Sequence, residues 1–247
     1  MIDINSMRWS FSKISSYDTC PYGWYKTYVL KEKGEDNAFA QFGGFCHEIL
    51  ERYADGELME WDLLDEYVNN FKSFVTYNFP PNKYVSLEES YYKDGYEYFK
   101  NFNGFGKFKI IGSEIEIDMK LNDKYNLIGY IDLLLEDENK DLVVWDHKSK
   151  SKFANKKEQV EYAKQLYIYS YYVKEKYGKF PKFLIFNMFR KNQRVVIPFS
   201  EKDYNDAIDW AVNTIEYIGT LDEFNAKQDK FFCNNLCNHR NTCENKI

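Results

Sequence analysis

The chain has 247 residues, of which 44% are hydrophobic and 29% are charged, and its formal net charge is −6. These values indicate a globular protein with a sizeable core, and the negative charge argues against diffuse attraction to nucleic acid. The sequence has no apolar run long enough to span a bilayer. Its N-terminus, MIDINSMRWSFSK, lacks the profile of a signal peptide, so we expect a cytoplasmic protein.

The first part of the sequence is predicted to be helical. Residues 10–30 favour a short helix that is capped by Ser10 or Ser12, interrupted at the Cys-Pro pair 20–21 and then resumed. The sequence from 61 to 102 favours one or two further helices with a break at FPPNKY. Between these segments, FGGFCHEILERY places one helical stripe of residues that we expect to face the core: Phe42, Cys46, Ile49, Leu50 and Tyr53.

From Lys109 on, apolar residues alternate with charged ones instead of following a helical spacing, and this change marks the start of the predicted strands. Three strands in succession predict an antiparallel meander, and they are followed by a helix ending near Gly178, a hairpin, and a last helix with Ser200 and Asp203 at its start. This order of elements predicts an α/β core with helical decoration. The segments cover residues 110–121, 125–136, 141–149, 158–178, 181–190, 194–200 and 201–219.

Charged side chains interrupt the apolar strand segments. Asp132 lies in one segment, and Asp146 lies in the next with Lys148 two positions later. Residues two apart share a face of a strand, and a paired strand can bring Asp132 beside them. Two close carboxylates suit Mg²⁺ or Mn²⁺, and a neighbouring lysine can orient an attacking water, as phosphodiester hydrolysis requires. On spacing alone, strand-end aspartates or a surface ion pair explain the pattern equally well. Glu114 and Glu116 could add a carboxylate, but alternation on an exposed strand face accounts for them.

These residues resemble the motifs of the PD-(D/E)XK nuclease superfamily and, within it, of the RecB-like nucleases. GYID, ending at Asp132, is similar to the Gly-x-x-Asp element, and DHK at 146–148 is similar to Asp/Glu-x-Lys. QLYIY is similar to Gln-x-x-x-Tyr through Gln165 and Tyr169, and FCHE supplies His47 on an early helix. The four elements stand in the order that the family has.

The resemblance implies a restriction-endonuclease-like core, in which helices flank a mixed central sheet. We expect a single RecB-like nuclease domain over residues 1–247. Its expected parts are an N-terminal helical part, a nuclease core, and a cysteine-rich tail that is joined to Cys20, which cover residues 1–107, 108–220 and 221–247.

The resemblance also implies roles for individual residues. Lys148 would position the attacking water. Gln165 and Tyr169 share a helix face with Tyr162 and Tyr172, a face that could orient Lys148 and stack on unpaired DNA. The residues that would hold the catalytic Mg²⁺ or Mn²⁺ are His47, Asp132, Asp146 and, through its backbone carbonyl, His147.

One turn before His47, the sequence has Gly43 and Gly44. Missing side chains at these positions leave room for a metal ion or for DNA.

Four of the five cysteines lie near the two ends of the chain, whereas Cys46 falls on the apolar stripe and is expected in the core. Four thiolates could close a site for zinc or for an iron–sulfur cluster, and spacing does not choose between them. His239 could replace one thiol in a zinc site. The four cysteines are Cys20, Cys233, Cys237 and Cys243.

The cysteine order is similar to that of the RecB-like subfamily typified by the CRISPR-associated nuclease of spacer acquisition, and of the nuclease half of AddB. That subfamily has one cysteine before the nuclease core and three after it, which hold a [4Fe-4S] cluster. Here the first gap in the tail is three residues, where the family commonly has two. The resemblance therefore favours a [4Fe-4S] cluster over zinc, as a structural staple between the tail and the N-terminal helix.

Taken together, the resemblance implies a metal-dependent DNA exonuclease that prefers single strands or frayed ends. Because the sequence has no nucleotide-binding P-loop, unwinding would require a helicase, CRISPR-adaptation or recombination protein as partner. The alternative is a catalytically silent, cluster-bearing DNA-binding or adaptor protein in a CRISPR or recombination complex, against which Asp132, Asp146 and Lys148 argue. A nuclease that acts on RNA is a third possibility.

Overall fold

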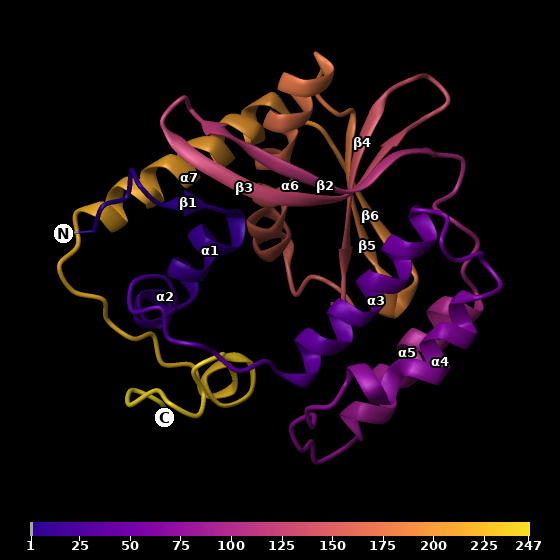
Figure 1. Cartoon of the computed structure of the whole chain (residues 1–247), viewed down its shortest axis with the longest axis horizontal. Helices are drawn as coiled ribbons and strands as arrows, with labels where there is room; N and C mark the ends of the chain where they lie inside the picture. Colours follow the sequence, from indigo (N-terminus) through magenta and orange to yellow (C-terminus); the bar gives the residue numbers. More distant parts are fainter. Residues whose placement is uncertain (1) are drawn as a thin grey trace.

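The computed structural model describes residues 2–247 and has a six-stranded mixed sheet at its centre (Figure 1). Strands β2 and β4 run antiparallel to β3, β6 runs antiparallel to β5, and the pairs β1–β3 and β4–β5 are parallel. The predicted mixed sheet and its antiparallel meander are confirmed. The strands are β1 (Arg8–Trp9), β2 (Lys109–Leu121), β3 (Tyr125–Glu136), β4 (Leu142–Lys148), β5 (Phe183–Met188) and β6 (Gln193–Pro198).

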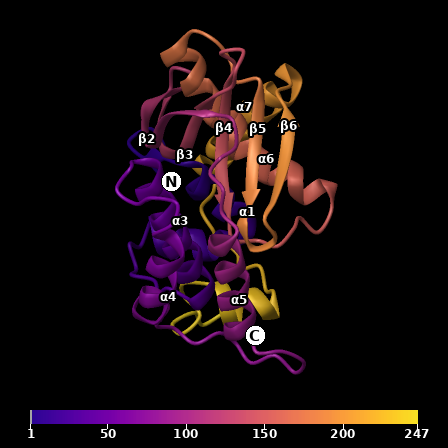
Figure 2. The same ribbon diagram turned by 90° about the vertical axis from the view of Figure 1, so that its right-hand side faces the viewer.

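Helices cover both faces of the sheet, and alternation along β4 divides the core between them. Val143 and Trp145 pack with α3, α4 and α5, whereas Leu142 and Val144 pack with α1, α2, α6 and α7. Figure 2 shows α3, α4 and α5 grouped together, with α6 and α7 behind the strands. Within residues 2–247, no helix is long and apolar enough to cross a membrane. The helices are α1 (Phe11–Thr19), α2 (Pro21–Tyr28), α3 (Ala38–Ala54), α4 (Leu63–Phe74), α5 (Leu87–Lys100), α6 (Lys156–Tyr177), α7 (Glu201–Gly219) and the short η1 (Phe189–Lys191) and η2 (Phe232–Leu236).

Local sequence signals set several of the helix ends. Ser10, rather than Ser12, caps α1 by accepting a hydrogen bond from the Lys13 N–H. The predicted interruption follows, because Cys20 has an extended backbone and the proline after it begins α2. Gly178 ends α6 in the left-handed conformation at φ 73°, as its position predicts.

Strand β3 has an opening on one of its two edges. Since β2 pairs with β3 along its whole length, β1 and β4 must share the other edge. β1 pairs with residues 126–127 and β4 pairs with residues 133–136, so residues 128–132 lie between them. The GYID segment therefore lies where no neighbouring strand of the described chain covers that edge.

The packing of α5 on α4 gives a test of the helical layer. A Cβ at Gly95 would overlap the hydroxyl and ring of Tyr67, which is fully buried and donates a hydrogen bond to the Tyr92 carbonyl. We expect Gly95→Ala to lower the free energy of unfolding by about 1–3 kcal/mol, because the ring has no free space to enter.

Gly44→Ala is the matched control, since a Cβ there meets nothing within 4 Å and alanine favours the helix by about 0.5–1 kcal/mol. Urea denaturation of both variants measures the difference. Equal stability of the two variants would contradict the packing described for Gly95.

Candidate active site

The two aspartates lie at the point where β3 and β4 separate. The paired positions end at Leu133 and Trp145, and the next residues along the two strands are Asp132 and Asp146. Asp132 Oδ2 accepts a hydrogen bond of 2.7 Å from the His147 N–H, a backbone donor that the strand ladder no longer uses. The end of the ladder thus brings the two carboxylates to one place.

Lys148 is the cation beside this pair. Its Nζ lies 3.0 Å from Asp146 Oδ1 and donates a hydrogen bond to it. Asp146 Oδ2 is 2.8 Å from the same nitrogen but outside hydrogen-bonding alignment, so this buried oxygen has no hydrogen-bond donor among the described residues. Burial raises the pKa of Asp146 although the charge of Lys148 opposes the shift. Burial opposes the charge of Lys148 in turn, but the carboxylates of Asp146 and Asp132 outweigh it and raise the pKa of the ammonium group.

Helix α6 holds Lys148 through two of its side chains. Gln165 Oε1 accepts from Lys148 Nζ at 3.1 Å, and Gln165 Nε2 donates to the Tyr169 hydroxyl at 3.1 Å. A Cβ at Gly129 would lie 3.1 Å from the ring of Tyr169. The glycine of GYID therefore lets Tyr169 approach β3, and the QLYIY residues align the lysine.

His47 approaches the carboxylates from α3. Its Nε2 lies 2.8 Å from the backbone carbonyl of His147, and its Nδ1 lies 3.5 Å from Asp132 Oδ2. The imidazole of His147 is buried and is paired with Asn187, and burial lowers its pKa well below the usual range. The carbonyl of His147 contacts His47, whereas its ring packs in the core.

Glu114 joins a group of candidate metal ligands, although the sequence, which allowed it as an added carboxylate, favoured an exposed position for it. Ligand atoms of His47, Glu114 and Asp132 all lie within 4.8 Å of one another. The interpretation of Glu114 as an exposed residue of an alternating strand is wrong, because it is half-buried, although Glu116 is exposed as expected. Burial first, and then the charge of Asp132, raise the pKa of Glu114 to about 7.

The backbone at Glu114 explains why alternation failed there. Glu114 has φ 41°, an uncommon and strained conformation for a residue other than glycine. The pairing of β2 with β3 is also irregular nearby, with a register shift between Ile110 and Gly112. Such irregularities turn side chains away from the positions that a regular pleat would give them.

The remaining residues of the expected site divide into near and distant groups. Tyr162 is near, with Lys148 Nζ 5.6 Å and Lys150 Nζ 5.3 Å from its ring centre. Tyr172 is ten residues further along α6, which is about 15 Å of helix. A Cβ at Gly43 would lie 3.2 Å from the Ser149 hydroxyl, so this glycine permits close packing against the end of β4, whereas Gly44 faces open space.

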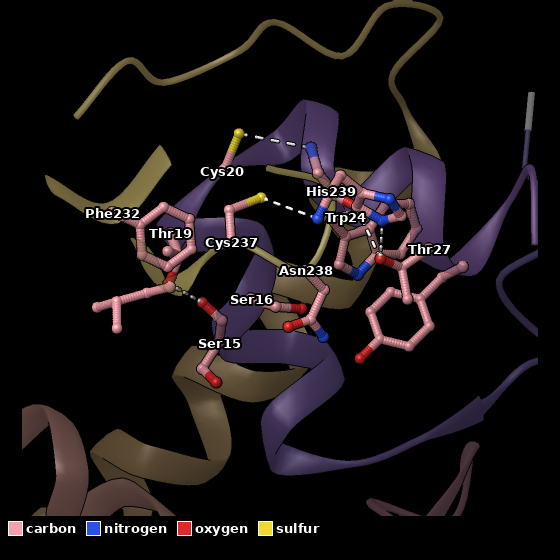
Figure 3. A pocket seen from close by; sticks show the side chains of 13 residues that line it. Ser15, Ser16, Thr19, Cys20, Trp24, Thr27, Phe232, Cys237, Asn238 and His239 are labelled. Atoms are coloured by element: carbon pink, nitrogen blue, oxygen red, sulfur yellow. Dashed lines mark hydrogen bonds between the residues drawn. The ribbon is translucent and has the colours of Figure 1, made fainter. Parts of the chain in front are cut away.

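Two of the four terminal cysteines, Cys20 and Cys237, line a pocket between the N-terminal helices and the tail. Cys20 Sγ accepts from the Gly23 N–H and Cys237 Sγ accepts from the His239 N–H, each at 3.4 Å (Figure 3). Burial raises the pKa of Cys237, and the charges of Cys243, Cys20 and Cys233 add to the shift. In the part of the chain that the structure describes, no three thiol sulfurs lie within 4.8 Å of one another.

Cys46, the remaining cysteine, is fully buried in the core, as predicted.

The family model of the PD-(D/E)XK nuclease superfamily matches residues 8–244. The chain belongs to the PD-(D/E)XK nuclease superfamily. Proteins of three Clostridium perfringens strains, each named as a subunit of an ATP-dependent helicase/deoxyribonuclease, are 26–27% identical over 163 residues, which is 52% of this chain and 14% of each relative. The chain thus spans a small part of these relatives.

The fold of this PD-(D/E)XK nuclease also has a solved counterpart. A structure from Eubacterium rectale named a putative exonuclease aligns with a TM-score of 0.55 and 12% identity, over 90% of this chain and 85% of that one. At this identity the likeness shows the fold alone, and it confirms the restriction-endonuclease-like arrangement expected from the sequence.

The donor set of this nuclease fits a divalent cation. Carboxylate oxygens from Glu114 and Asp132 suit Mg²⁺ or Mn²⁺, and the imidazole of His47 adds a donor that favours Mn²⁺. Asp146 lies outside this group of close ligand atoms. Its buried Oδ2 has no hydrogen-bond donor among the described residues and lies 2.8 Å from Lys148 Nζ, and a cation would stabilise it further.

Glu114→Gly is expected to separate stability from metal affinity. In EDTA at pH 8, glycine removes both the left-handed strain and the buried charge, so the free energy of unfolding should rise by about 1 kcal/mol or more. Mn²⁺ affinity should fall, because a carboxylate ligand is lost. Urea denaturation and calorimetric Mn²⁺ titration measure the two effects.

Glu114→Gln is the matched control, because it removes the charge and keeps the side chain at the strained φ. The pKa of Glu114 is about 7 in the folded protein, above its ordinary value of 4.5. The contribution of Glu114 to the free energy of unfolding therefore falls as the pH rises from 4.5 to about 7. The Gln variant should therefore gain stability at pH 8 but not at pH 4. Identical behaviour of the two variants would show that the backbone at Glu114 is unstrained.

Proposed function

We propose that this PD-(D/E)XK nuclease is a metal-dependent DNA exonuclease that prefers single strands or ends. One observation carries the proposal: Asp132 and Lys148, both partly exposed, meet the buried Asp146 where β3 and β4 separate, in a chain whose family is established. In this proposal His47, Glu114, Asp132 and Asp146 hold Mg²⁺ or Mn²⁺, with the His147 carbonyl as a further donor.

Each group then has a chemical task. A bound divalent cation supplies Lewis-acid stabilisation of the charge that develops on the scissile phosphate. Lys148 orients the attacking water and stabilises negative charge, and Gln165 and Tyr169 fix the direction of its ammonium group. Because Asp146 accepts a hydrogen bond from Lys148, the lysine stays charged and correctly placed before substrate arrives.

The relatives support DNA as the substrate and a helicase as a partner. The similar Clostridium perfringens proteins are named as helicase/deoxyribonuclease subunits, and the similar structure is named as an exonuclease. Tyr162, flanked by two lysines, offers a ring for an unpaired base beside groups that attract phosphate. We therefore infer that a separate helicase, a recombination protein or a CRISPR-adaptation protein delivers the single strand.

End-labelled single-stranded DNA tests this proposal. Wild-type protein should degrade it with Mg²⁺ or Mn²⁺ and not with EDTA, and Asp132→Asn and Lys148→Met should lose on the order of 10²-fold or more in rate. Circular single-stranded DNA should remain intact if a free end is required, and RNA in parallel reactions measures the choice of substrate.

Asp118→Asn is the control, because it removes an exposed carboxylate of β2 that pairs with Arg8 at the surface. It should leave the rate unchanged. Cleavage that survives both active-site variants would place the site elsewhere. No cleavage by folded wild-type protein under any condition would favour the DNA-binding or adaptor alternative.

We propose that Cys20, Cys233, Cys237 and Cys243 hold a structural [4Fe-4S] cluster. Backbone N–H donors to Cys20 and Cys237 suit thiolate ligands, and Cys20 stands at the N-terminus of α2, where a negative charge is favoured.

The tail that carries Cys233, Cys237 and Cys243 is attached to the segment before α3. Glu35 N–H donates to the Asn238 carbonyl at 2.8 Å, and the side chain of Asn37, which caps α3, donates to the Leu236 carbonyl at 3.2 Å. Arg240 donates to the carbonyls of Glu35 and Asp36. In this proposal the cluster fixes the tail, and the tail fixes the start of the helix that carries His47.

Anaerobic purification tests the cluster. The wild-type protein should contain iron and sulfide in equal amounts and little zinc, and Cys237→Ser should lose most of the iron, because one corner of the cluster loses its thiolate. Cys46→Ala is the control and should retain the iron. Stoichiometric zinc with no iron would overturn the assignment and favour the zinc site.

A further inference from the structure

A second pocket lies one side chain away from Lys148. It occupies about 340 Å³ between α1, α6 and α7, and its aromatic walls are Phe11, Tyr162 and Trp210. We call it the Trp210 pocket. Tyr162 has been given a role as a ring for an unpaired base, but the rest of this pocket has no role in what has been described so far.

The rings of the Trp210 pocket are held in place. Trp210 Nε1 donates to Asp18 Oδ2 at 3.2 Å, Lys164 Nζ lies 4.4 Å from its ring centre, and its ring centre is 5.9 Å from that of Phe11. A ring that is fixed before the ligand arrives loses little entropy on binding. The pocket is therefore suited to a flat group that stacks.

The side chains that line the pocket do not favour phosphate. Asp18 and Glu161 line it together with the hydroxyl groups of Ser15 and Thr19. Glu161 is paired with Lys164 Nζ at 2.5 Å, so the negative charge of the lining rests on Asp18. Carboxylates repel an anionic backbone, but they accept hydrogen bonds from the amino edges of nucleobases. A neutral aromatic ring with polar edges fits this lining.

Tyr162 is shared between this aromatic pocket and the lysines of the proposed active site. Lys148 and Lys150 lie within 5.6 Å of the centre of its ring, and the same side chain lines the Trp210 pocket. Groups that attract a phosphate and a pocket that suits a base therefore adjoin the same side chain. The phosphate and the base of one nucleotide are neighbours in the same way.

We propose that the Trp210 pocket binds one unpaired nucleobase of the strand whose phosphate lies at Lys148. This proposal rests on the proposed nuclease function, and it explains why that nuclease would prefer single strands. A base that is paired in a duplex cannot enter, so the pocket selects unpaired strands and frayed ends.

Binding of single-stranded DNA in EDTA tests the pocket without cleavage. Fluorescence anisotropy of cluster-loaded protein should show that Trp210→Ala weakens binding about 5- to 150-fold, as expected for one lost stacking partner, and that Trp210→Phe largely restores it. Trp61→Ala, which removes a tryptophan that is 77% exposed elsewhere, is the control and should bind as wild type does.

An abasic scan separates stacking from a structural defect. One abasic nucleotide, placed at successive positions, should weaken binding to wild type strongly at one position only, and this position-specific loss should vanish in Trp210→Ala. At that position 2-aminopurine should be quenched by wild type and not by Trp210→Ala. Identical abasic profiles for both proteins, or no binding of single-stranded DNA at all, would overturn the proposal.

The outcome is distinguishable from failure of the proposed function. Position-specific coupling without any metal-dependent cleavage would leave the base pocket standing and overturn the exonuclease. Cleavage that depends on Asp132, without coupling between Trp210 and any base, would support the exonuclease and overturn the base pocket.

Discussion

The arrangement of this site depends on one constraint: two neighbouring carboxylates lie where little water reaches them, so their negative charge must be compensated. Asp146 is only 2% exposed, and Asp132 stands beside it at the end of the same strand ladder. A buried anion costs several kcal/mol unless a cation or hydrogen bonds compensate it. Lys148 supplies that compensation within the protein, and Gln165 aligns it, so the hydrogen bonds from α6 to β4 follow from the need to neutralise the pair.

The sequence predicted the parts of this arrangement that depend on local periodicity. Alternation and the succession of predicted strands placed Asp132 and Asp146 on adjacent antiparallel strands, and helical spacing placed Gln165 and Tyr169 on one face of α6. What it could not predict depends on tertiary contacts. Strand β1 is only two residues long and has no period to detect, yet it bounds the open edge of β3.

The position of Glu114 also could not be predicted from local sequence patterns. Alternation assigns it to the exposed face, but a positive φ turns it toward His47 and Asp132. That strain persists only because the pairing of β2 with β3 on both sides of it holds the backbone in place. No local signal in the sequence distinguishes Glu114 from Glu116, although only Glu114 joins the ligand group.

The net charge of −6 gives these short-range contacts their importance. A chain with this charge gains little from long-range attraction to phosphates, so affinity must come from groups that touch the strand. Lys148 and Lys150 can contact one or two phosphates, and the proposed base pocket adds stacking that does not depend on charge. A duplex offers phosphates but no free base, whereas an unpaired end offers both. The same composition that argues against diffuse DNA binding therefore favours selection of single strands at this site.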